Sequence, residues 1–234
     1  MSVVPFADIE KTVFEIVNET PVFDIHTHLY DSVFGGLLLW GIDELLTYHY
    51  LVAEVFRQHP IPYETFWSMS KKEQADIVWK HLFLENSPVS ESCRGVLTSL
   101  KELGLDVSSR DLDGFRRYFS DTDVESHIDK VFSAGNIESV VMTNNPFDDA
   151  ERSVWERSPS LDKRFRAALR LDPLLIEWEK TRPLLKEWGF DVSEDFKGKT
   201  YKEITRFLEH WTEKMHPLYM AVSLPPVSYT HLTL

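Results

Sequence analysis

The stretch Pro21-Val22-Phe23-Asp24-Ile25-His26-Thr27-His28-Leu29 decides how the rest of the chain is interpreted. Its apolar residues predict a short, fully buried β-strand over residues 22–26, and Pro21 suits a strand's first position, where a missing N–H costs little. Residues two apart in an extended chain point to the same face, so His26 and His28 can direct both imidazoles into one space.

The two histidines have a chemical and a structural interpretation. Two convergent neutral imidazoles form half of a site for zinc or a similar divalent ion. The alternative is that one histidine packs in a core while the other caps a turn. The position of the pair at the C-terminal end of a buried strand, in a chain that alternates strands and helices, favours the metal site.

Composition excludes several classes of partner. The chain has 234 residues, 43% of them hydrophobic, which is enough to bury a sizeable core. The net charge of −13 argues against nucleic acid, and the lack of a basic run argues against an anionic membrane. The single cysteine, Cys93, excludes an internal disulfide and agrees with a reducing compartment. With no signal peptide or apolar run of about 20 residues, we expect a cytoplasmic protein.

Strand-like segments recur at residues 137–143, 166–171 and 218–224. The first two end in polar residues, as parallel barrel strands do at the active-site end. Between the first and second strands, a helical insertion is predicted over about residues 42–135. The sequence therefore predicts an α/β fold: a partial (β/α)8 TIM barrel with about four parallel strands.

Two features of the insertion carry specific predictions. Ser70-Lys71-Lys72-Glu73 has the form of a capping box that opens a helix running through Leu84. A second helix is predicted from Ile42 to about Phe56, and its apolar stripe includes His49. This periodicity, taken alone, predicts that His49 is buried in the core.

The motifs also resemble a known family. A strand ending D-x-H-x-H-L near the N-terminus resembles the first barrel strand of the amidohydrolase superfamily, whose members are metal-dependent (β/α)8 enzymes. The pair His49-Tyr50, on a helical insertion after H-x-H, narrows the resemblance to uronate (glucuronate) isomerases. The resemblance implies that His26 and His28 hold a divalent metal, zinc or alternatively manganese, and that His49 and Tyr50 are catalytic.

Two later stretches match the family more loosely. Leu169-Arg170-Leu171-Asp172 resembles W-R-P-D, which makes Arg170 the candidate for binding the substrate. The alternative for Arg170 is a salt bridge with an acid at the barrel rim. Thr143-Asn144-Asn145-Pro146 resembles T-D-D-P, with both acids replaced by amides.

The resemblance implies a uronate isomerase that interconverts D-glucuronate with D-fructuronate, or D-galacturonate with D-tagaturonate. The reaction would be metal-assisted proton transfer through an enediolate. Its partner would be a small uronate, and a homo-oligomer is compatible with the sequence. Two alternatives stay open: another amidohydrolase-superfamily hydrolase or decarboxylase, and a non-catalytic fragment.

The resemblance covers only the N-terminal half of the family. We therefore expect residues 1–226 to form the N-terminal part of a barrel domain and residues 227–234 to be a non-native tail. The metal-binding Asp that the family takes from its eighth strand has no counterpart here. This chain alone is accordingly expected to be inactive.

Overall fold

A computed structural model describes residues 8–27, 29–195 and 197–223. The chain forms two compact units. One comprises Met1–Pro21 and Leu39–Ile137, and is called the helical unit. The other comprises Val22–Leu38 and Glu138–Leu234, and is called the sheet unit. The predicted tail, residues 227–234, lies outside the described residues.

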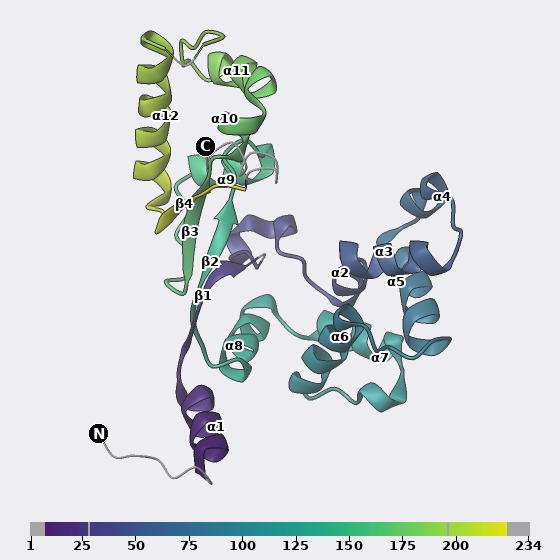
Figure 1. The fold of residues 1–234 in the computed structure, drawn as a ribbon. Coiled ribbons are helices and arrows are strands. Elements are labelled where there is room, and N and C mark those ends of the chain that lie inside the picture. Colours follow the sequence, from purple (N-terminus) through teal and green to yellow (C-terminus); the bar gives the residue numbers. More distant parts are fainter. Residues whose placement is uncertain (1–7, 28, 196, 224–234) are drawn as a thin grey trace. The chain divides into compact units, whose positions relative to one another are not determined.

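Among its described residues, the sheet unit contains four strands in the order β1-β2-β3-β4 (Figure 1). They are β1 (Val22–Thr27), β2 (Ile137–Asn144), β3 (Phe165–Arg170) and β4 (Tyr219–Ala221). The strands β2, β3 and β4 pair in parallel, with Val140 opposite Phe165 and Ala168 opposite Tyr219. The predicted partial barrel of four parallel strands is confirmed. The fourth strand was predicted over residues 218–224, whereas β4 ends at Ala221.

Helices follow the strands of this sheet. They are η2 (Ser32–Leu37), α9 (Asp149–Glu156), α10 (Asp172–Ile176), α11 (Trp178–Glu187) and α12 (Lys199–Met215). The centres of β2 and β3 are buried, and α12 contributes Phe207, Trp211 and Met215 to the buried set. Alternating strands and helices with buried central strands are the pattern of a parallel barrel.

The prediction that β1 is fully buried is wrong. Val22, Phe23 and Ile25 are 43%, 46% and 63% exposed. The strand order places β1 at the edge of the described sheet, with β2 as its one neighbour. A parallel strand is buried only where other elements cover it, and an apolar sequence does not supply that cover.

The helical unit has no strand among its described residues outside Ile137, where β2 begins. Its helices are α1 (Ile9–Glu19), α2 (Ile42–Leu46), α3 (His49–Gln58), α4 (Tyr63–Ser68), α5 (Lys71–Trp79), the π-helix η3 (Lys80–Leu84), α6 (Glu91–Glu102), η4 (Val107–Ser109), α7 (Leu112–Asp121) and α8 (Val124–Ala134). The capping box of Ser70 and Glu73 is confirmed at the start of α5. In the described parts of both units, no helix combines the length and apolar character that a membrane crossing requires.

The helix predicted over residues 42–56 is broken in two. The Thr47 hydroxyl donates to the Asp43 carbonyl at 2.7 Å, and Tyr48 adopts an extended conformation as the N-cap of α3. His49 therefore begins a new helix and is exposed. The interpretation of His49 as a core histidine is wrong, because the break removes it from the buried stripe.

Candidate functional site

A pocket of about 470 Å³ lies within the sheet unit. It is lined by His26, Thr143 and Arg170, and by residues 219–223. The first three come from near the C-terminal ends of β1, β2 and β3. In parallel barrels, this is the edge of the sheet that carries active sites.

His26 presents its imidazole to this pocket. Thr143 Oγ1 lies 3.3 Å from His26 Nδ1, and the same hydroxyl donates to the Thr27 carbonyl at 3.4 Å. The backbone N–H of His26 donates to the Asp24 carboxylate at 3.0 Å. Both the ring and the main chain of His26 are thus positioned by polar contacts. Its predicted partner, His28, lies outside the described residues.

Arg170 lines the same pocket and also forms the salt bridge that was its alternative interpretation. Its Nε donates to Asp172 Oδ2 at 2.9 Å, and the Asp172 side chain is only 8% exposed. Asp172 also accepts the backbone N–H of Ser223. Burial opposes ionisation of Asp172, but the bonds from Arg170 and Ser223 outweigh it, so its pKa is lowered.

The ion pair leaves Arg170 equipped to bind an anion. Only Nε is engaged by Asp172, and within residues 8–27, 29–195 and 197–223 the terminal Nη1 and Nη2 groups make no hydrogen bond to protein. A guanidinium held at Nε presents its remaining donors in a fixed plane, which suits a carboxylate. The salt bridge and a substrate-binding role are therefore compatible.

A buried network near the end of β2 was not predicted from the sequence. Glu151 of α9 is 5% exposed and accepts hydrogen bonds from the Tyr30 hydroxyl at 2.9 Å, the Asn144 side chain at 3.0 Å and the Asn145 N–H at 3.0 Å. Burial raises the pKa of Glu151, and these bonds only partly oppose it. Burial and the nearby Glu151 carboxylate also raise the pKa of Tyr30. The signal available in the sequence was an acid in the first turn of the helix after β2.

The other two predicted site residues belong to the helical unit. His49 and Tyr50 begin α3, their ring centroids lie 4.1 Å apart, and Tyr50 is 59% exposed. The structure thus brings His26 and Arg170 to one pocket. That His49 and Tyr50 serve the same site stays a prediction.

Solved structures resemble this chain over nearly its whole length. A uronate isomerase from Bacillus halodurans C-125 matches 96% of the chain with a TM-score of 0.92 and 52% sequence identity. The chain is a relative of uronate isomerases. A glucuronate isomerase from Caulobacter crescentus matches 95% of it with a TM-score of 0.64 and 16% identity, which shows the shared fold alone.

The chain spans only part of the proteins it matches. It covers 53% of the Bacillus halodurans chain and 51% of the Caulobacter crescentus chain. The family resemblance inferred from H-x-H and His-Tyr is confirmed for the N-terminal portion of these enzymes. No protein-family model matches the sequence. No curated protein matches it either.

Proposed function

We propose that this chain supplies the N-terminal half of a uronate isomerase, which interconverts aldose and ketose uronates. The substrates would be D-glucuronate and D-fructuronate, or D-galacturonate and D-tagaturonate. The observation that carries the proposal is the 52% identity over 96% of the chain to a uronate isomerase. The pocket at the strand ends supports it, because it combines an imidazole with an arginine suited to a carboxylate.

Arg170 would bind the substrate carboxylate. Its Nη groups would form charge-assisted bonds to both oxygens, while Asp172 holds Nε and so fixes the plane of the guanidinium. Asp172 is a positioning residue in this scheme, and its own bond to Ser223 joins the arginine to the segment after β4. The carboxylate end of a uronate is thereby oriented relative to the strand ends.

His26 fits the role of a metal ligand. His26 lines the same pocket as Arg170, and Thr143 contacts Nδ1, as outer hydrogen-bonding groups do when they orient metal-binding imidazoles. His26 and His28 would hold a divalent cation, zinc or manganese. When bound, this cation would supply positive charge that stabilises a developing oxyanion.

His49 and Tyr50 would carry the proton between C2 and C1. An imidazole can accept and return a proton near neutral pH, and a tyrosine hydroxyl can donate a hydrogen bond to the enediolate. Both side chains are exposed in the helical unit, so they are accessible to a substrate.

The test compares the 234-residue chain with a version extended to the full length of its uronate isomerase relatives. Each is assayed with D-glucuronate and D-galacturonate, with added zinc or manganese. We expect turnover by the extended protein only, because the relatives are about twice as long as this chain. Robust turnover by the 234-residue chain, lost in His26→Ala, would show that the site is complete without the extension.

Arginine variants of the extended protein test the substrate contact. Arg170→Met should lower kcat/KM by about 10- to 100-fold, from the roughly 1.5–3 kcal/mol that a charged hydrogen bond contributes. Arg166→Met is the matched control, since Arg166 is exposed on the same strand. Equal effects of the two changes would remove Arg170 from substrate binding. Hydrolysis or decarboxylation of a small acid, without isomerisation, would favour the other superfamily reactions.

A further inference from the structure

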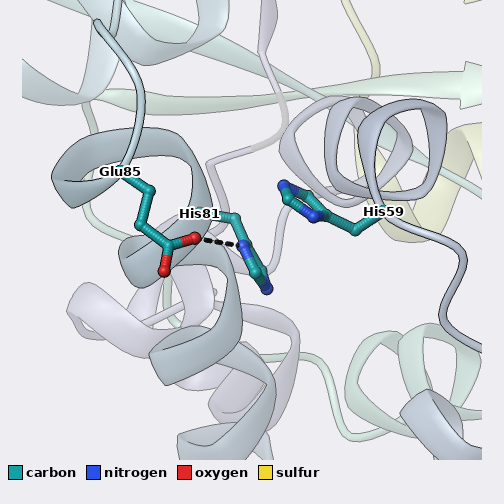
Figure 2. A group of neighbouring side chains, drawn as sticks. All are labelled: His59, His81 and Glu85. Atoms are coloured by element: carbon teal, nitrogen blue, oxygen red, sulfur yellow. Dashed lines mark hydrogen bonds and ion pairs between the residues drawn. The ribbon is translucent and has the colours of Figure 1, made fainter.

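Two histidines and a glutamate converge within the helical unit. His59 immediately follows α3, His81 lies in the π-helix η3, and Glu85 follows η3. One ligand atom from each residue lies within 4.8 Å of those of the other two. Figure 2 shows Glu85 reaching towards the His81 ring, with the His59 ring on the other side of His81. The three residues are called the His-His-Glu cluster.

The contacts within the His-His-Glu cluster are close. The two imidazole rings stack with their centroids 3.6 Å apart and their planes inclined by 28°. The Glu85 carboxylate lies 2.7 Å from Nδ1 of His81. Nε2 of His59 is buried and has no hydrogen-bond partner in the described part of the chain. A buried polar atom without a partner is unfavourable, and coordination of a cation is one way to satisfy an imidazole nitrogen.

The local backbone positions these side chains. In η3 the Glu85 N–H donates to the Lys80 carbonyl at 3.0 Å, the widened turn that defines a π-helix. Such turns are rare and recur at functional sites. The Asn86 side chain donates to the His81 carbonyl at 2.7 Å, and the His59 N–H donates to the Val55 carbonyl at 2.8 Å. Both histidine backbones are therefore held by hydrogen bonds.

We propose that the His-His-Glu cluster binds a zinc-type divalent cation. Two imidazole nitrogens and one carboxylate oxygen form a donor set that suits zinc, whereas magnesium and calcium prefer oxygen ligands. Ligand bonds of about 2.0–2.2 Å place neighbouring donor atoms on one zinc ion roughly 3.3 Å apart. The observed separations reach 4.8 Å and the two imidazoles are stacked, so one ring must rotate before the in-plane lone pairs of both meet one ion.

Glu85 is the ligand best able to adjust. Its side chain is 46% exposed and its other oxygen pairs with Lys80 at 3.5 Å, a contact between two exposed groups that costs little to break. Water would complete the coordination. The bound ion would join the C-terminal end of α3 to η3, and α3 is the helix that begins with His49 and Tyr50. The site therefore acts as a clamp within the helical unit.

The test measures zinc binding to the full 234-residue chain. Because His26 and His28 are also proposed ligands, the parent protein is the double variant His26→Ala, His28→Ala, freed of metal with a chelator. Zinc is titrated into it by calorimetry. We expect one equivalent to bind, with affinity at least tenfold lower after His81→Gln or Glu85→Gln. His210→Gln, an exposed histidine of the sheet unit, is the matched control and should change nothing.

Two results would overturn the proposal. One is an absence of stoichiometric zinc binding by the parent protein. The other is equal zinc affinity in the parent, His81→Gln and Glu85→Gln proteins, which would place the ion elsewhere. Circular dichroism of the metal-free proteins checks that each variant is folded. If His81→Gln unfolds the chain, Glu85→Gln, a change at the surface, still tests the site. Zinc should also raise the thermal midpoint of the parent but not of His81→Gln.

Discussion

Replacing Glu151 tests whether the buried network near the end of β2 stabilises the sheet unit. Glu151→Ala removes the acceptor of the Asn144 side chain and of the Asn145 N–H. The Tyr30 hydroxyl retains the Thr143 carbonyl at 3.3 Å. Two donors thus lose their partner, at about 1–3 kcal/mol each. Removing a buried carboxylate offsets part of this cost, so we expect the free energy of unfolding to fall by about 3 kcal/mol.

Urea unfolding followed by far-UV circular dichroism measures the change. Hydrogen exchange resolved by peptide should locate it around residues 144–156, with peptides from the helical unit as an internal reference. Glu156→Ala is the matched control, because Glu156 is exposed on the same helix. Glu151→Gln should cost less than Glu151→Ala, since its amide oxygen can still accept from Asn144 and Asn145. A loss below about 1 kcal/mol in Glu151→Ala would refute the reasoning.

The pH dependence of this network has a definite sign. Burial raises the pKa of Glu151 in the folded state, so folding favours the protonated carboxyl. The stability that Glu151 contributes to the fold is therefore fully present below the ordinary glutamate pKa of 4.5. It is lost as pH rises through the raised pKa of the folded state. The stability of the wild type relative to Glu151→Gln should fall over that window. A stability of the wild type relative to Glu151→Gln that rises with pH would contradict a raised pKa of Glu151.

Three further predictions concern single residues. Ser70→Ala should lower the free energy of unfolding by about 1 kcal/mol, measured by urea unfolding, because α5 loses its N-cap; an unchanged value would deny the cap a role. Asp172→Asn should lower the free energy of unfolding at neutral pH, measured by urea unfolding. Because the pKa of Asp172 is lowered in the folded state, the difference in this free energy between the variant and the wild type should shrink as pH falls below 3.8. Burial raises the pKa of the Cys93 thiol, so a thiol reagent should modify the native protein far more slowly than the urea-unfolded one, and equal rates would contradict this.

The sequence by itself determined the elements whose signals are local. Short apolar runs located all four strands, and the strand–helix alternation predicted a partial barrel. One helix start was also predicted correctly: Ser70 accepts the backbone N–H of Glu73 as the N-cap of α5. These features depend on neighbours within a few residues, so propensity and periodicity suffice to identify them.

Tertiary structure alone decided burial and convergence. The exposure of β1 depends on how many strands lie beside it. No local pattern predicts that the Tyr30 hydroxyl donates to the buried Glu151 carboxylate. The meeting of His59 with His81 likewise requires α3 and η3 to pack together. Such contacts join residues far apart in the chain, and only the packing of whole elements brings them within bonding distance.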